Sequence, residues 1–169
     1  MPAPDGEPSP VAVRPAVAGD ADLLLGWRND PGVRGWSRSS EPIDRESHAA
    51  WLRRSLTDAD RHILIVSAVA DGVAVGTTRY DVRSADGSRT RWEISIAVAP
   101  EMRGRGFGDA TLRASDAWLL ATEPAAAEIV AWIRPANAGS RRLFERNGYG
   151  ATPSEEPDLD CYVRRWERR

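Results

Sequence analysis

The chain has 169 residues, of which 41% are hydrophobic and 28% charged, values typical of a globular domain with a sizeable core. Its 25 acidic and 23 basic residues give a net charge of −2, which argues against a nucleic-acid-binding domain. The single cysteine, Cys161, excludes an internal disulfide and a cysteine-based metal cluster, and two histidines argue against a histidine-rich metal site.

No apolar run approaches the roughly 20 residues that a membrane-spanning helix needs. The first ten residues lack the basic and apolar regions of a signal peptide, so we expect a cytoplasmic protein with no membrane partner. Residues 1–10 are polar and rich in proline, which predicts a disordered tail, and residues 11–169 predict a single domain. Both a monomer and a homodimer are compatible with the sequence.

The domain is predicted to begin with a short strand over 11–14 and two helices. The first helix begins at Ala21 and is ended by the Asn29–Pro31 run, because proline cannot continue a helix. A loop over 31–43 follows, and a second helix runs from about 44 to 56. The loop is unusually rich in arginine and tryptophan for a connector.

Three strands separated by turn sequences follow, and they predict an antiparallel meander over residues 61–99. Asp71-Gly72 and the run 84–87 are the turn signals. The remaining predicted elements are a helix to about 122, a strand over 128–133, a helix over 137–146 and a hairpin of 149–153 with 158–166. This order predicts a mixed α/β layer.

The most informative stretch is a strand, a turn and a helix over Trp92–Leu112. The strand shows the two-residue apolar period, Pro100 ends it, and the turn Arg103–Gly108 holds three glycines and two arginines. Glycine allows a ligand to approach the backbone, and the first amides of a helix attract anions. The turn therefore predicts an anion site, although a solvated connector remains the alternative.

Two other phosphate-binding motifs do not fit this turn. The chain has no lysine, which excludes a P-loop. Glycines at 104, 106 and 108 miss the G-x-G-x-x-G spacing of dinucleotide-binding turns, and this turn follows a late strand instead of the first.

The pattern Arg103-x-x-Gly106-x-Gly108, preceded by Val98-Ala99-Pro100, resembles the acetyl-CoA signature of the GNAT superfamily of N-acetyltransferases. About thirty residues later, the run Asn137–Tyr149 is similar to the second motif of that family, Asn-x-x-Ser/Ala-x-x-Leu-Tyr/Phe-Glu-x-x-Gly-Phe/Tyr. Two motifs in the right order make the resemblance specific.

The resemblance implies an α/β fold with a central, mostly antiparallel mixed sheet and helices on both faces. It further implies that the fourth and fifth strands, Glu93–Ala99 and Glu128–Ile133, splay apart to admit acetyl-CoA as the co-substrate, with no metal. The cofactor-binding residues that it implies are Ile96, Ala97, Val98, Arg103, Gly104, Arg105, Gly106, Phe107, Gly108, Asp109, Asn137, Ser140, Arg141 and Phe144.

The resemblance also suggests catalytic residues for transfer of an acetyl group to an amine. Glu93 interrupts an apolar strand and is the candidate general base; the alternative is a carboxylate paired with Arg79 or Arg91. The family's usual acid is a tyrosine, but that position is Phe144, which cannot donate a proton. Ser140 lies four residues earlier on the same helical face and is the candidate donor, or else it binds backbone.

For the acceptor, the expected binding residues are Arg34, Trp36, Arg38 and Tyr80. The run Trp27–Arg34 is similar to a family branch that acetylates amino-sugar nucleotides and ribosomal-protein N-termini, which favours a small-molecule amine such as an amino sugar. Alternatives are a protein N-terminus, an antibiotic amine or, in another class, a non-catalytic module that binds acyl-CoA.

Overall fold

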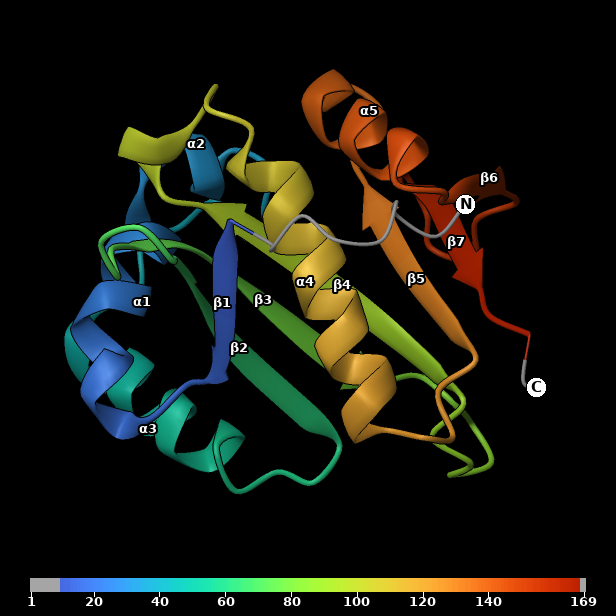
Figure 1. Ribbon diagram of the computed structural model, residues 1–169, viewed down its shortest axis with the longest axis horizontal. Helices are drawn as coiled ribbons and strands as arrows, with labels where there is room; N and C mark the ends of the chain where they lie inside the picture. The colour runs from blue at the N-terminus through green and yellow to red at the C-terminus, as the bar shows by residue number, and fades with distance from the viewer. Residues whose placement is uncertain (1–9, 168–169) are drawn as a thin grey trace.

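A computed structural model describes residues 10–167 of the chain (Figure 1). The tail predicted over 1–10 therefore lies, apart from residue 10, outside the described residues. Among the helices of residues 10–167, none is both long and apolar enough to cross a membrane.

One seven-stranded sheet forms the centre of the molecule, in the order β1-β2-β3-β4-β5-β7-β6. Its strands are β1 (Val11–Pro15), β2 (Arg61–Ala68), β3 (Ala74–Val82), β4 (Arg91–Val98), β5 (Glu128–Ile133), β6 (Gly150–Thr152) and β7 (Asp160–Arg165). Neighbouring strands are antiparallel except β4 and β5, which run parallel. The mixed, mostly antiparallel sheet predicted from the sequence is confirmed.

The helices are α1 (Ala21–Asn29), α2 (Pro31–Arg34), α3 (Arg45–Ser55), α4 (Phe107–Thr122) and α5 (Ala138–Arg146), with 3₁₀ turns at Ala18–Asp20 and Pro100–Met102. The short α2 lies in the segment predicted as a loop. It forms because the Asp30 side chain accepts a hydrogen bond from the Val33 amide and Pro31 occupies the first helical position.

Helices cover both faces of the sheet (Figure 1). On one face, the buried side chains Leu112 and Leu119 of α4 join a core cluster with Tyr80 and Trp92. On the other face, α1 and α3 pack on β2, where Ile63 and Ile65 join a second cluster with Leu24, Trp27 and Leu52. Side chains that alternate along β3 and β4 therefore point either to α4 or to the opposite face.

The parallel strands β4 and β5 pair only at their beginnings. Their register covers Arg91↔Glu128, Trp92↔Ile129 and Glu93↔Val130, and β4 continues to Val98 paired only with β3. Strand β5 meanwhile stays paired with β7 from Glu128 to Ile133. The two strands thus diverge after Glu93, as the splayed fold predicted.

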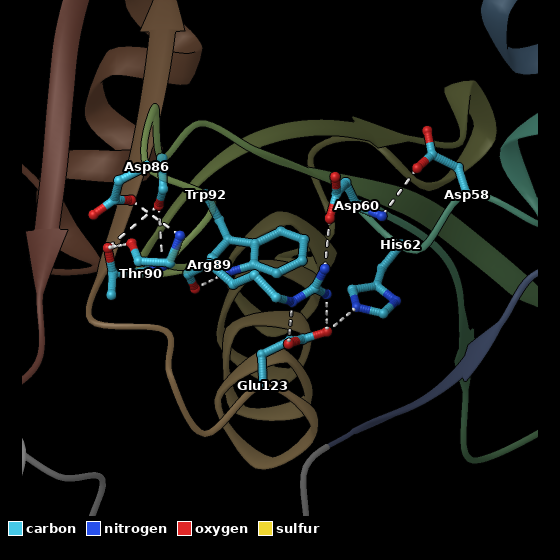
Figure 2. A network of polar contacts seen from close by, with 10 residues as sticks. Asp58, Asp60, His62, Asp86, Arg89, Thr90, Trp92 and Glu123 are labelled. Carbon is cyan, nitrogen blue, oxygen red and sulfur yellow. Dashed lines mark hydrogen bonds and ion pairs between the residues drawn. The ribbon is translucent and has the colours of Figure 1, made fainter.

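An ion-pair network fixes the start of β4 (Figure 2). The Glu123 carboxylate, just after α4, accepts hydrogen bonds from Arg89 at 2.6 and 3.1 Å and lies 2.7 Å from Nε2 of His62. Arg89 also donates to Asp60 and lies over the Trp92 ring, 5.0 Å from its centroid. The start of β4 is therefore fixed to α4 and β2.

A carboxylate is buried under the middle of α4. Asp116 is 2% exposed and accepts hydrogen bonds from the hydroxyls of Tyr80 at 2.7 Å and Tyr149 at 2.9 Å. Burial raises the pKa of Asp116 to about 6, although these two bonds and the charge of Arg164 act in the opposite direction. The hydrogen bonds from the two tyrosine hydroxyls thus offset part of the cost of burying the Asp116 carboxylate.

Candidate active site

Because β4 and β5 are parallel, the segments that follow them meet at one edge of the sheet. The turn Arg103–Gly108 after β4 and the start of α5 after β5 both lie there (Figure 1). The Leu143 side chain of α5 lies 3.5 Å from the position of a side chain at Gly108. The two motifs recognised in the sequence are therefore adjacent in space.

The glycine turn has the backbone that an anion site requires. Gly104 and Gly106 have φ values of +70° and +81°, a conformation that disfavours other residues. Gly106 is the N-cap of α4 and offers no side chain to the first amides of the helix, and a Cβ placed there meets no atom within 4 Å. No N-cap side chain therefore covers these amides, which is the backbone geometry expected of an anion site.

The arginines of this turn are partly engaged elsewhere. Arg103 donates to Asp30 at 2.8 Å, and Arg105 lies over the Phe107 ring. Both are exposed, with the Arg103 side chain 42% accessible. In the first turn of α4, Asp109 pairs with Arg146 at 2.8 Å, which joins α4 to the end of α5. Asp109 therefore has a structural partner in addition to its expected role.

The start of α5 combines a helix cap with the expected cofactor contacts. The Asn137 side chain accepts from the Ser140 amide at 3.1 Å. Ser140 is partly exposed, and Arg141 donates to the carbonyl of Pro135 at 3.0 Å. Phe144 is buried, with its ring 4.9 Å from that of Tyr149. Asn137 thus has the N-cap role that the sequence left open beside cofactor binding.

Beyond Glu93, the edge of β4 that faces β5 has no strand partner within residues 10–167. Ile96, Ala97 and Val98 lie on this stretch and are partly exposed. Their alternate backbone groups bond to β3, so the others point toward the diverging β5. Backbone donors and acceptors are consequently available along the position expected for the cofactor arm.

Glu93 is the last residue of β4 that pairs with β5, and it lies where the two strands diverge. Its carboxylate is almost fully buried, with 6% of the side chain accessible. One oxygen, Oε2, accepts from Nε of Arg83 at 2.6 Å, and the other, Oε1, accepts from Arg38 at 3.3 Å. The partners are therefore Arg83 and Arg38. The pairing with Arg79 or Arg91 that the sequence suggested as an alternative is wrong, because Arg79 bonds to Asp81 and Arg91 pairs with Glu128.

A cleft of about 290 Å³ opens next to Glu93 on the face opposite α4. Its lining residues come from β2, β3, β4 and three loops beside them: Arg38, Asp58, Asp60, Arg61, Arg79, Asp81, Val82, Arg83 and Glu93. The four arginines and four acidic residues balance in charge. Glu93 is thus part of the wall of an open cleft.

The loop that was expected to bind the acceptor reaches this cleft through Arg38. Its backbone is held by Arg28, which donates to the Ser39 carbonyl, and by Arg134, which donates to the Ser37 carbonyl, each at 2.9 Å. Trp36 is 47% exposed, and neither it nor Arg34 lines the cleft. Among the expected loop residues, the structure thus brings Arg38 to Glu93.

Tyr80 is placed differently from the expectation that it binds the acceptor. It is 0% exposed and donates its hydroxyl proton to Asp116 on the α4 face. Burial first, and then the neighbouring Asp116 charge, raises the pKa of Tyr80 well above its usual value. Since β3 side chains alternate, Arg79 and Asp81 face the cleft and Tyr80 faces the core.

Sequence reasoning missed two residues of the site, Arg83 and Trp132. Arg83 holds Glu93, and the guanidinium carbons of Arg83 and Arg38 lie 5.7 and 6.0 Å from the Trp132 ring centroid. The available signal for Arg83 was its spacing from Asp81. The two residues are two positions apart at the end of β3, and side chains at this spacing lie on the same face of a strand. Across residues 10–167, no group of three or more His, Cys, Asp or Glu residues is arranged to hold a metal ion.

Comparison with known families now identifies the family. The acetyltransferase (GNAT) domain family matches residues 11–150. The chain belongs to the GNAT acetyltransferase family. It is therefore an acetyl-CoA-dependent N-acetyltransferase, as its two motifs indicated.

Solved GNAT structures share the fold at low sequence identity. An aminoglycoside acetyltransferase, AAC(6')-Ib, solved with ribostamycin and coenzyme A, superposes with a TM-score of 0.78 and 21% identity over 92% of this chain and 93% of that chain. The spermidine N-acetyltransferase of Vibrio cholerae, solved with CoA and spermine, superposes with a TM-score of 0.76 and 18% identity over 92% of this chain and 94% of that chain.

A third similar structure is the GNAT domain of S. lividans PAT, with a TM-score of 0.76 and 22% identity over 92% of this chain and 90% of that chain. No curated protein sequence matches the chain. At these identities the structures establish the fold, and the acceptor has to be argued from the residues of this chain.

Proposed function

We propose that this acetyltransferase moves an acetyl group directly from acetyl-CoA to the primary amine of a small molecule. The observation that supports this is the position of Glu93, which lies both at the divergence of β4 and β5 and on the wall of the open cleft. The donor site and the acceptor cleft therefore meet at one buried carboxylate. An amino sugar, free or linked to a nucleotide, is the favoured acceptor class.

In the proposed reaction, the amine nitrogen attacks the thioester carbonyl carbon, a C–N bond forms, and the C–S bond breaks. The amine must first lose a proton, and Glu93 is proposed to accept it directly or through water. Free backbone N–H groups of β4 near Ile96 are proposed to bind the carbonyl oxygen as negative charge develops. Ser140 is proposed to relay a proton from water to the thiolate, so that its own hydroxyl proton is replaced as it is given up.

In the proposed mechanism, positioning contributes more than proton transfer. The leaving thiolate is already stable, because an ordinary thiol in water has a pKa of about 8.5. Gly104 to Gly108 and Asn137 are proposed to hold the cofactor, while Arg38 and the cleft orient the amine. Cys161 has no part in this scheme, because it is buried on β7, between β5 and β6, and burial raises the pKa of its thiol.

The test is calorimetric titration with acetyl-CoA, followed by measurement of thiol release with a panel of amines. The panel contains amino-sugar nucleotides, amino-sugar phosphates, aminoglycosides, polyamines and short peptides. We expect binding of acetyl-CoA and turnover of an amino sugar or its nucleotide. Turnover of peptides alone would instead indicate a protein N-terminal acetyltransferase, and turnover of aminoglycosides alone an antibiotic acetyltransferase.

A further inference from the structure

The two arginines that hold Glu93 differ in how firmly they are placed. Arg83 follows β3 directly, its amide bonds to the Arg91 carbonyl at 2.8 Å, and its guanidinium makes two contacts with Oε2 of Glu93. Arg38 lies in a loop between α2 and α3 and makes one contact with Oε1, at 3.3 Å. Its side chain is 58% accessible, against 42% for Arg83. Arg38 is thus the exchangeable partner.

Arg38 also has other groups close to it. Its guanidinium lies 3.8 Å from a carboxylate oxygen of Glu156 and 6.0 Å from the centroid of the Trp132 ring. These two contacts keep the guanidinium at the cleft when its bond to Glu93 is broken. The displaced side chain would therefore stay beside a bound acceptor.

The charge balance of the cleft constrains what replaces Arg38 on Glu93. Its four arginines and three of its four acidic residues already form ion pairs with one another or with neighbours, and the fourth, Asp58, accepts a hydrogen bond from the Asp60 amide. An incoming ammonium that takes Oε1 of Glu93 leaves the Arg38 guanidinium with Glu156 alone as an acidic partner, at 3.8 Å. That distance is too long for a direct hydrogen bond, so an anionic group on the acceptor can supply the close charge-assisted pair that Arg38 has lost.

We propose that the acceptor is zwitterionic: its ammonium replaces Arg38 on Oε1 of Glu93, and its anionic group pairs with the released Arg38. The anion is a phosphate or a carboxylate, which share the geometry that a guanidinium recognises. This inference rests on the proposed function, because it takes Glu93 as the residue that meets the amine. A polycation brings no anion for Arg38 and adds like charge beside it.

The test is calorimetric binding of matched amines to the protein loaded with CoA, which cannot turn over. The pairs are ethanolamine and phosphoethanolamine, glucosamine and its 6-phosphate, and propylamine and β-alanine; spermidine and kanamycin are the polycations. We expect at least one amine that carries an anionic group to bind about tenfold or more tightly than its partner without that group. It should also bind about tenfold or more tightly than either polycation. This difference corresponds to one charge-assisted pair. The phosphate and carboxylate pairs distinguish the two anions.

Variants of Arg38 identify the residue responsible. Arg38→Gln should abolish the preference for the anionic member, Arg38→Lys should restore part of it, and Arg45→Gln should keep it, because Arg45 pairs with Asp22 at an exposed position outside the cleft. In turnover, Arg38→Gln should raise the KM of the amine that carries an anionic group about tenfold more than the KM of its partner without that group. A general loss of fold would instead reduce CoA binding as well.

Three results would overturn the inference: tighter binding of spermidine or kanamycin, an unchanged preference in Arg38→Gln, or no binding by any member of the pairs. The proposed function is tested separately by thiol release. Acetyl transfer without an anion preference would overturn this inference alone, whereas absence of transfer to every amine would overturn the proposed function.

Discussion

The two ends of β4 are built from different kinds of residue. At its first residues, β4 is paired on both sides, and Arg89, Glu123 and His62 lock it to its surroundings (Figure 2). At its last residues, β4 has lost β5 and continues into a turn of glycines in left-handed conformation. At the first end, ion pairs between side chains occupy the charged groups. At the second end, backbone groups that no longer pair with β5 are the ones we expect to contact a ligand.

Glycines with the same backbone conformation occur at both ends, which allows a matched test. Gly106 has φ +81° in the turn after β4, and Gly87 has φ +70° in the turn before it. Gly106→Trp should reduce acetyl-CoA affinity by about 100-fold or more, since it obstructs amides that we expect to contact phosphate. Calorimetry with acetyl-CoA measures this loss.

Gly87→Trp is the control, because it carries a similar strain of about 1–2 kcal/mol without approaching the cofactor. It should bind acetyl-CoA normally. If the two variants lose the same affinity, backbone strain alone explains the effect, and the assignment of the open end is wrong.

Two carboxylates form the second matched pair, Glu93 at the divergence and Glu123 at the closed end. Glu93→Gln should lower kcat about 100-fold, the range expected for loss of a general base. The deficit should be greatest at pH values where the amine is mostly protonated, because deprotonation is then the missing step. Thiol release measured across pH tests this, and a parallel pH profile in the variant would make Glu93 structural.

Asp116 belongs to neither end and predicts a pH effect on stability alone. Its folded pKa of about 6 exceeds the ordinary 3.8, so its contribution to stability is fully present below about pH 3.8 and is lost as pH rises through 6. This gap corresponds to about 3 kcal/mol. As the pH rises from 4 to 7, the free energy of unfolding of Asp116→Asn should therefore increase by about that much relative to that of the wild type.

Urea unfolding at several pH values measures the difference for Asp116→Asn, and titrations shared by both proteins cancel in it. A difference that does not vary with pH would contradict the prediction. The affinity for acetyl-CoA should stay unchanged, because Asp116 lies under α4 and does not reach the cleft.

The smallest effect is expected for Glu123→Gln. Burial acts to raise the pKa of Glu123, but bonds from Arg89 and His62 outweigh it and lower the pKa overall. Its contribution to stability is present above about pH 4.5 and is lost as pH falls through the lowered folded pKa. We expect a loss of about 1 kcal/mol at neutral pH, measured by urea unfolding. A change in kcat would show that the two ends are coupled.

Local rules were sufficient to predict the open end of β4 from the sequence. Pro100 ends the strand, glycines 104 and 106 adopt the left-handed turn, and Asn137 caps α5. Each of these depends on residues near in sequence, and the family motifs cover the same positions. Apart from α2, which was predicted as loop, the helices and strands agree with their predicted ranges to within about three residues for the same reason.

The acceptor side depended on contacts between distant residues, and here prediction was incomplete. Arg38 lies 55 positions from Glu93, and nothing local indicates which arginine pairs with which acid. Tyr80 and Arg79 are neighbours on β3, yet one lies in the core and the other lines the cleft. To predict which of the two is buried, one must know on which face of the sheet α4 packs. The spacing of residues along β3 does not give that information.

The position of β7 has a consequence for the order in which the molecule assembles. This strand is the last in the chain, yet it lies between β5 and β6 in the sheet. Until residues 160–165 have left the ribosome, β5 has only three paired positions with β4, and its outer edge is uncovered. Completion of the acetyltransferase sheet therefore waits for its final strand, and a nascent chain paused before Asp160 exposes an unpaired strand that can associate with other chains.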